Sequence, residues 1–145
     1  MSGNRRFVDT NILLYAHDTS AGSKHERARE LLERLWDTRE GCVSVQILQE
    51  FFVNVTKKIP KPLDAAAAKD IIADLSRWHM HVPAADDVLG AIGLHQRYGI
   101  SFWDSMMVRS AVEMGCGVIY SEDLNHGQSY DGARVENPFL ATTGG

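Results

Sequence analysis

Residues 6–16 read RFVDTNILLYA, and this short stretch contains a strand, an acidic residue and the start of a helix. Residues 6–9 have the character of a brief β-strand that ends on Asp9. Thr10 or Asn11 can cap the helix that begins with the apolar run at residues 12–16. Open α/β proteins bind ligands at the carboxyl ends of their strands, so a functional site is expected at this junction.

Short strands and amphipathic helices alternate along the rest of the chain. Strands are expected at residues 42–45, 79–82 and 118–120, with a further short one around residues 134–136. Helices are expected at residues 24–38, 46–58, 64–78, 84–98 and 102–114. This alternation predicts βα units, which form a parallel sheet with helices on both faces. We therefore expect one α/β domain over residues 1–145, in three α/β/α layers around a mainly parallel sheet of four or five short strands.

The composition is that of an ordinary globular protein with an acidic balance. Of the 145 residues, 15 are Lys or Arg and 19 are Asp or Glu, which gives a formal net charge of −4. This balance argues against non-specific binding of nucleic acid through basic residues, although a metal-dependent nuclease also gathers carboxylates. Cys42 and Cys116 stand far apart, which excludes a disulfide framework and a structural zinc site. No apolar run suits a membrane span and no secretory signal is visible, so we expect a cytoplasmic protein.

Four acidic residues occupy positions that suit a common site. Asp9 and Asp123 each follow a predicted strand, Glu50 lies one turn into a helix, and Asp104 begins another helix among apolar neighbours. Each residue also has a simpler interpretation. Asp9 and Asp123 fit turn or helix-capping positions, and Asp104 suits the positive end of a helix dipole. Glu50 lies roughly 140° from the centre of its helix's apolar face, where a solvated side chain is expected.

Together the four acids predict a metal site. Carboxylates brought within a few ångströms of one another repel, and they cannot all stay ionised without a cation. Oxygen ligands without matching His or Cys suit Mg²⁺ or Mn²⁺. Such ions, when they keep open coordination positions, usually serve phosphoryl or phosphodiester chemistry.

Four motifs of the chain resemble those of the PIN-domain ribonucleases. Val8-Asp9-Thr10-Asn11 resembles the opening motif, and residues 44–51, SVQILQEF, resemble the second. Residues 102–105, FWDS, are similar to the third motif, and residues 120–124, YSEDL, to the fourth. The motifs follow the order and spacing of the family, and the resemblance extends from residue 7 to residue 139. PIN domains of this length most often resemble the VapC-type toxins of toxin–antitoxin pairs.

The resemblance implies a role for each motif residue and a PIN-like version of the three-layer fold. The catalytic acid cluster would consist of Asp9, Glu50, Asp104 and Asp123. The metal ligands would be Asp9, Asp104 and Asp123, and the supporting hydrogen bonds would come from Thr10, Asn11 and Ser121.

The segment after Ser121 contains three further candidates. Many family members carry an additional Asp where this chain has Asn125, which would support the cluster as an uncharged oxygen ligand. Glu122 is an alternative to Asp123 as the fourth acid. His126 either contacts a substrate phosphate or braces its own loop.

The activity that the resemblance implies is Mg²⁺- or Mn²⁺-dependent hydrolysis of RNA phosphodiester bonds by the toxin of a type II toxin–antitoxin system. It also implies an RNA substrate, a cognate antitoxin and a homodimer. Two alternatives stay open at this point. One is a PIN-fold module that binds RNA or protein without cleaving, and the other is a housekeeping RNA-processing nuclease.

Large apolar side chains fall into two groups by their position on the helical faces. Phe102, Trp103, Met106 and Met107 are expected in the core rather than on a base-stacking surface. Trp36 and Val53 lie at the edges of their helices' apolar arcs, and we expect them, with Phe52, to line an apolar groove for the antitoxin.

Overall fold

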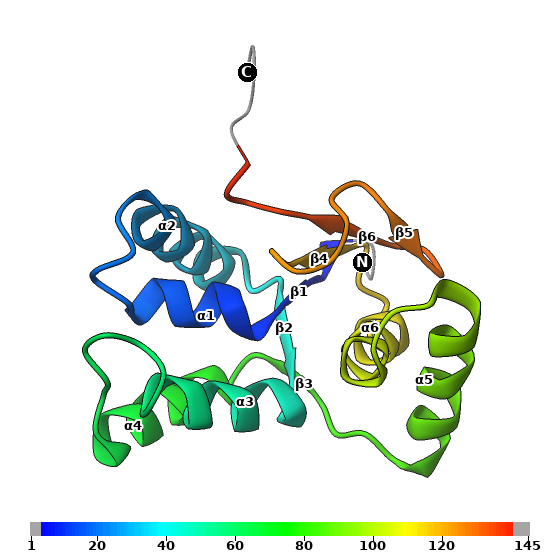
Figure 1. Cartoon of the computed structure of the whole chain (residues 1–145), viewed down its shortest axis with the longest axis horizontal. Coiled ribbons are helices and arrows are strands. Elements are labelled where there is room, and N and C mark those ends of the chain that lie inside the picture. The colour runs from blue at the N-terminus through cyan, green and yellow to red at the C-terminus, as the bar shows by residue number, and fades with distance from the viewer. Residues whose placement is uncertain (1–3, 141–145) are drawn as a thin grey trace.

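The computed structural model describes residues 4–140, which form a mainly parallel sheet between two layers of helices (Figure 1). The strands are β1 (Arg6–Val8), β2 (Gly41–Ser44), β3 (His79–His81), β4 (Val118–Tyr120), β5 (Ser129–Tyr130) and β6 (Ala133–Glu136). The helices are α1 (Thr10–His17), α2 (Ser23–Thr38), α3 (Val45–Val55), α4 (Ala65–Leu75), α5 (Ala85–Tyr98) and α6 (Phe102–Glu113). Helices α1 to α4 lie on one side of the sheet, and α5 and α6 lie on the other.

The sheet has six strands in the order β3-β2-β1-β4-β6-β5. All neighbours pair in parallel except β5, which runs antiparallel to β6. The expectation of four or five strands was therefore too low. The additional strand, β5, has only two residues, and so short a segment carries no detectable alternation of apolar and polar side chains.

Strand β1 lies in the middle of the sheet, and its pairing with β2 and β4 determines which residues meet at the carboxyl ends of the strands. Residue Arg6 pairs with Gly41 of β2 and with Val118 of β4, while Val8 pairs with Tyr120. The carboxyl ends of β1, β2 and β4 therefore meet at one edge of the sheet. The backbone N–H of Asp9 continues this pairing and donates to the Tyr120 carbonyl oxygen over 3.0 Å.

One continuous cluster of buried apolar side chains holds the layers together. The inner strands contribute fully buried side chains, among them Phe7, Val8, Val43 and Ile119. Each such side chain stabilises the fold by about 1.5–3 kcal/mol relative to an exposed position. The strands that carry the acidic residues are thereby fixed in a rigid core.

The helices begin close to the predicted residues, with one correction at the first of them. Asp9, not Thr10 or Asn11, caps α1, and its carboxylate accepts a hydrogen bond from the Thr10 backbone N–H at 2.6 Å. Asp64 caps α4 as expected and accepts from the Ala67 N–H at 2.8 Å. Helix α3 ends at Val55, whereas the sequence predicted that it would continue to residue 58. None of the helices found between residues 4 and 140 has the length and apolar character required to cross a bilayer.

Candidate active site

Asp9 is the most buried carboxylate of the site, with 7% of its surface exposed. It follows β1 directly, so the central strand fixes its position at the carboxyl edge of the sheet. Besides the Thr10 N–H, its carboxylate accepts hydrogen bonds from the Ser121 hydroxyl at 2.8 Å and from the Asn11 side-chain amide at 3.4 Å. Three neutral donors therefore surround a buried negative charge.

Ser121 connects the first strand to the loop that carries the fourth motif. It follows β4 and is fully buried. Its hydroxyl donates to Asp9 and accepts hydrogen bonds from the backbone N–H groups of Asp123 and Leu124, at 3.2 and 3.4 Å. Because of these bonds the loop turns back over the end of β1, and Asp123 comes to lie beside Asp9.

Asn11 links the acid of the first motif to the acid of the fourth motif. Its side-chain amide donates to the Asp123 carboxylate at 3.0 Å and, more weakly, to the Asp9 carboxylate at 3.4 Å. The three supporting residues predicted from the first and fourth motifs thus all lie within the hydrogen-bond network of the acids.

Glu50 joins this network from α3 through Thr10. The Thr10 hydroxyl donates to Glu50 Oε1 at 2.9 Å, and Glu50 is partly buried where α3 packs against α1. The helical wheel of α3 places Glu50 away from the apolar face of that helix, as the structure also shows. The side chain nevertheless faces the neighbouring helix, which a wheel for α3 alone does not represent.

Asp104 lies in the first turn of α6 and is partly buried. Ser101 caps this helix and accepts a hydrogen bond from the Asp104 backbone N–H at 3.1 Å. Burial raises the pKa of the Asp104 carboxyl, the Ser101 side chain partly opposes this, and the charge of Asp123 raises it further. Asp104 is therefore electrostatically linked to the acids that follow the strands.

The pKa shift is larger at Asp9 than at Asp104. Burial is the main reason why the pKa of Asp9 rises from 3.8 to about 7. Hydrogen bonds from Ser121 and Thr10 lower that pKa in part, whereas the charges of Asp123 and Asp104 raise it. Among residues 4–140, none of the ion pairs involves Asp9, Glu50, Asp104 or Asp123. The cluster thus carries negative charge that no cationic side chain in this part of the chain neutralises.

Glu122 behaves differently from its neighbour Asp123. Its carboxylate accepts a hydrogen bond from the Tyr15 hydroxyl at 2.7 Å and forms an ion pair with Lys24. Burial works to raise the pKa of Glu122, but the bonds from Lys24 and Tyr15 outweigh it and lower that pKa. Sequence reasoning did not anticipate this role of Tyr15 and Lys24, because no local pattern links residues that are about a hundred positions apart.

The remaining candidates of the loop contact their own segment. Asn125 is exposed and donates to the Gln128 side chain at 3.1 Å, and no hydrogen bond in the described range joins it to the acids. The His126 ring accepts a hydrogen bond from the Asn137 backbone N–H at 3.0 Å. Of the two roles considered for His126, the structure therefore shows loop bracing.

The donors of the cluster are oxygen atoms of carboxylates, the ligand type that Mg²⁺ and Mn²⁺ prefer. The most buried of them, Asp9, has no cationic partner among residues 4–140. Within the described part of the chain, no group of three or more His, Cys, Asp or Glu side chains is arranged so that it could hold a metal ion. The acids therefore fit such a cation by the type of their donor atoms, not by a formed ligand set.

Trp103, which was expected in the core, is instead exposed. Met106 and Met107 are buried as predicted, but 63% of the Trp103 surface is accessible. The prediction was therefore wrong for the residue that directly precedes Asp104.

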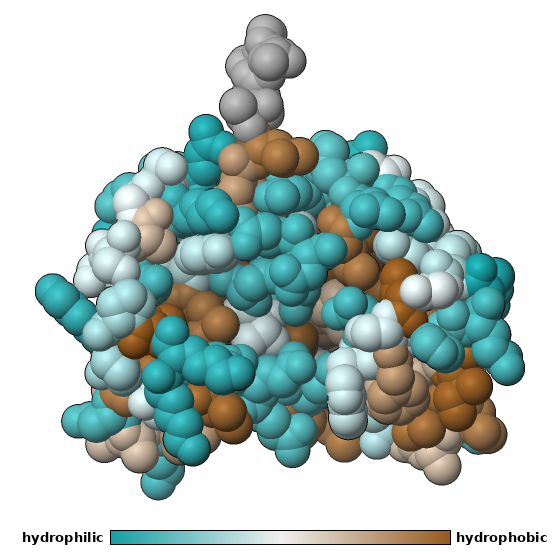
Figure 2. Space-filling view, in the orientation of Figure 1, coloured by the Kyte–Doolittle hydropathy of each residue, from teal (hydrophilic) through white to brown (hydrophobic). Residues whose placement is uncertain are grey.

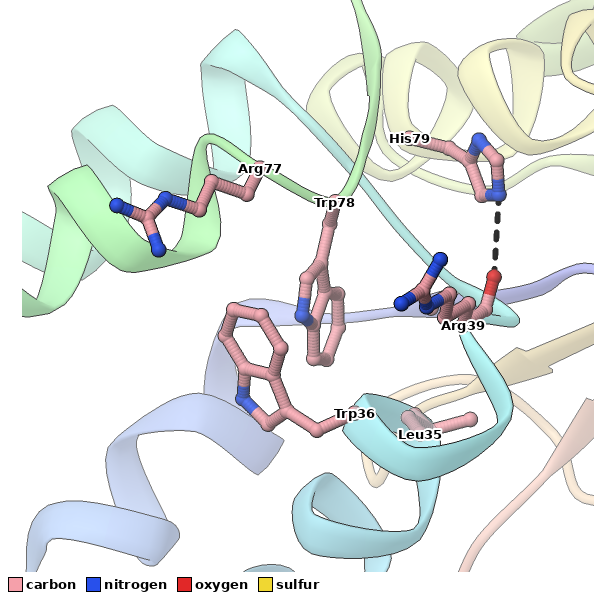
Figure 3. Close-up of a pocket in the computed structure, with 7 residues that line it drawn as sticks. Leu35, Trp36, Arg39, Arg77, Trp78 and His79 are labelled. Atoms are coloured by element: carbon pink, nitrogen blue, oxygen red, sulfur yellow. Dashed lines mark hydrogen bonds between the residues drawn. The ribbon is translucent and has the colours of Figure 1, made fainter.

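One cavity lies away from the acids. It measures about 430 Å³ and is lined by Leu35, Trp36, Arg39, Gly41, Arg77, Trp78 and His79. Gly41 and His79 begin β2 and β3, so this cavity lies at the opposite end of the strands from Asp9. The indoles of Trp36 and Trp78 meet edge to face with centroids 5.5 Å apart, and the His79 ring contacts the Arg39 carbonyl oxygen (Figure 3).

The predicted apolar groove is therefore divided. Trp36 belongs to the cavity just described, whereas Phe52 and Val53 line a separate shallow groove of about 390 Å³. That groove lies on α3 and reaches Ile72 of α4. The three side chains are exposed as predicted, but the structure does not place them on one surface.

Comparison with known proteins places this geometry in a family. The model of the PIN domain matches residues 6–129, which include all four acids. The chain belongs to the PIN-domain family. A search among curated proteins finds no match for this PIN domain.

Solved structures share the PIN fold of this chain at low sequence identity. A toxin–antitoxin complex from Klebsiella pneumoniae matches with a TM-score of 0.69 and 18% identity, over 94% of this chain and 99% of the other. A DNA-bound VapBC from Salmonella typhimurium gives 0.65 and 18%, over 92% and 98% of the two chains. VapC20 of Mycobacterium tuberculosis, described as a sarcin–ricin loop cleaving toxin, gives 0.60 and 19%, over 81% and 89%. These likenesses confirm the predicted three-layer α/β arrangement.

Proposed function

We propose that this PIN domain is a metal-dependent endoribonuclease that hydrolyses RNA phosphodiester bonds. The observation that carries the proposal is the buried Asp9 carboxylate, which lies beside further acids and forms no ion pair within residues 4–140. In this proposal Asp9, Asp104 and Asp123 hold Mg²⁺ or Mn²⁺, and Glu50 completes the catalytic cluster. A bound cation would activate a water molecule and offset the charge of the phosphate in the transition state.

Neighbouring residues favour the ionised form of the acids and hold them in position. Ser121 and the Thr10 N–H favour the ionised form of Asp9, which is the form that a cation binds. The Thr10 hydroxyl engages Oε1 of Glu50 and leaves Oε2 as an acceptor for a proton from the attacking water. Asn11 keeps Asp123 beside Asp9 while both are charged. In-line attack by water would leave a 5′-phosphate and a 3′-hydroxyl.

We further propose that the protein is the toxin of a type II toxin–antitoxin pair and acts in the cytoplasm. Support comes from the fold, which it shares with chains of toxin–antitoxin complexes from several bacteria. The cognate antitoxin would cover the apolar groove at Phe52 and Val53. It would also direct an Arg or Lys side chain towards the acids, where charge-assisted hydrogen bonds replace the metal.

A homodimer is part of the same proposal. The chain exposes Val88, Leu89 and Ile92 on α5, together with Val82 just before this helix. In the space-filling view, apolar surface gathers over α5 at the lower right (Figure 2). Contiguous apolar surface on a protein this small suits contact with another chain.

The test is a cleavage assay with purified protein and unstructured RNA. We expect cleavage in Mg²⁺ or Mn²⁺, loss of cleavage in chelator, and recovery when metal is restored. Asp9→Asn should abolish cleavage, whereas Asp64→Asn, which keeps a cap at the start of α4, should not alter it. If metal-loaded protein leaves RNA intact, the chain is a non-cleaving binding module.

A second assay addresses the toxin role. Expression of the active chain alone should arrest growth, and co-expression of the neighbouring small reading frame should restore it. If expression leaves growth unaffected while the purified protein still cleaves RNA, the protein is an RNA-processing nuclease and not a toxin.

A further inference from the structure

A small hollow opens beside the acid cluster. It measures about 250 Å³ and is lined by Gln46, Gln49 and Glu50 of α3 and by Trp103 of α6. Glu50 also accepts the hydrogen bond from Thr10, which adjoins Asp9. Asp104 directly follows Trp103 in the chain. Any polymer held at the acids therefore runs close to this hollow.

Trp103 forms one wall of the hollow. Its indole is restrained by neighbouring residues but remains exposed to solvent. The Gln46 side-chain amide donates to the Trp103 backbone carbonyl oxygen at 3.2 Å. The Phe102 ring meets the indole edge to face, with centroids 5.1 Å apart and an interplanar angle of 73°. These contacts restrain the residue, while most of its surface stays open to solvent. An aromatic face that is already ordered loses little entropy when a flat ligand stacks on it.

The chemistry of the lining suits a nucleobase. Aromatic side chains bind bases through stacking, which tolerates all four bases because each has a π-face. A base edge also carries N–H donors. The side-chain amides of Gln46 and Gln49 line the hollow and supply polar groups for such an edge. The Gln46 amide oxygen has no hydrogen-bond partner among residues 4–140, so a turn of this side chain towards a bound base would cost no existing bond of that oxygen. Bases inside a duplex already stack and pair, so only an unpaired base can occupy the hollow.

We propose that the hollow lined by Gln46, Gln49, Glu50 and Trp103 is a subsite for an unpaired nucleobase, stacked on Trp103, next to the RNA phosphate at the acid cluster. This inference rests on the proposed ribonuclease function and deepens it by naming the residue that holds a base next to the phosphate. It also assigns an exposed tryptophan that the acid chemistry does not use.

The experiment measures RNA binding without cleavage. Asp9→Asn protein is titrated with a labelled, unstructured RNA oligonucleotide, and the series is repeated with an abasic residue at each successive position. The variants Trp103→Ala and Trp103→Phe are added to this background. Trp36→Ala is the matched control, because Trp36 also exposes its indole but lines the cavity at the opposite end of the strands (Figure 3).

The expected result is a coupling between one base and one side chain. Trp103→Ala should weaken binding of the intact RNA by about 5- to 100-fold, as loss of one base stack does. Trp103→Phe should restore most of the affinity, and Trp36→Ala should leave it unchanged. At one abasic position, Trp103→Ala should no longer have an effect, because the base that stacks on the indole is absent.

Three outcomes would overturn the subsite. They are unchanged affinity in Trp103→Ala, equal loss for intact RNA and for every abasic RNA, and loss that follows conversion of a dimer to monomers by mass measurement. The last would make Trp103 a contact between chains. Failure of the ribonuclease proposal is separate: wild-type protein that does not cleave but shows the base coupling would be a non-cleaving binder with this subsite.

Discussion

At the scale of single residues, the surroundings of Asp9 oppose the charge that its roles require. As the cap of α1 and as a proposed metal ligand it acts through a carboxylate, yet burial beside other acids favours the protonated form. With a pKa of about 7, Asp9 is only partly ionised near neutral pH in the absence of a cation. Binding of the proposed cation would therefore stabilise the ionised form of Asp9.

The first prediction concerns the stability of the metal-free protein. Because the folded state holds the Asp9 proton more tightly than the unfolded chain, Asp9 lowers stability as pH rises from 3.8 to about 7. Asp9→Asn removes this loss and still caps α1, so it should raise the unfolding free energy at pH 8, by at most about 4 kcal/mol. Asp104→Asn should act in the same direction. Urea denaturation of the two variants and of the wild type, in chelator at pH 5 and pH 8, measures these changes. If both variants are less stable than the wild type at pH 8, the two acids are structural caps.

The second prediction separates the two adjacent acids of the fourth motif. Asp123→Asn should reduce cleavage by several orders of magnitude, because it removes a proposed metal ligand. Glu122→Gln should retain most of the activity, since Glu122 is engaged by Tyr15 and Lys24. Its ion pair with Lys24 is partly exposed, so its loss should cost little stability. The measurement is the metal-dependent cleavage rate of each variant. If Glu122→Gln lost more activity than Asp123→Asn, Glu122 would be the fourth acid.

At the scale of elements, the sequence predicted the helices well because they carry periodic signals and four of them begin at a capping side chain. Apart from the cap of α1 and the end of α3, the features that it missed arise between elements. Glu50 lies away from the core in the wheel of α3, yet α1 supplies its partner Thr10. Trp103 lies at helical spacing from the buried Met106 and Met107, yet 63% of its surface is exposed. Strand β5 has two residues and is defined by pairing with β6 alone.

The third prediction concerns the start of β2. A Cβ atom added to Gly41 would lie 2.6 Å from the ring of the buried Trp78, so the ring or the strand must move. Gly41→Ala should therefore destabilise the protein by about 1–3 kcal/mol. Gly93→Ala in α5 is the matched control, since nothing lies within 4 Å of its Cβ position. There the change should stabilise by up to about 1 kcal/mol. Thermal unfolding of both variants checks this contrast, and equal effects would contradict it.

At the scale of the whole molecule, metal and protons should compete for the same carboxylates. A cation that binds only the folded state stabilises it by mass action, by about 2.7 kcal/mol at a hundred times its dissociation constant. Since Asp9 must lose its proton to bind, the fourth prediction is a larger rise in melting temperature with Mg²⁺ or Mn²⁺ at pH 8 than at pH 5. Calorimetric scans at both pH values measure the rise, which should vanish in Asp9→Asn. A rise that persists in that variant would place the cation elsewhere.

The strand order also determines when the acid cluster exists during synthesis. Asp9 leaves the ribosome early with β1, but its hydrogen-bond partner Ser121 is made 112 residues later, and β6, which supports β4, later still. Until then the central strand lacks one neighbour, and Asp9 and Asp123 cannot meet. A chain in translation is surrounded by ribosomal and messenger RNA, which are the class of substrate proposed here. Under the proposed ribonuclease function, this topology would keep the nascent chain inactive towards the RNA around it until β6 has been made.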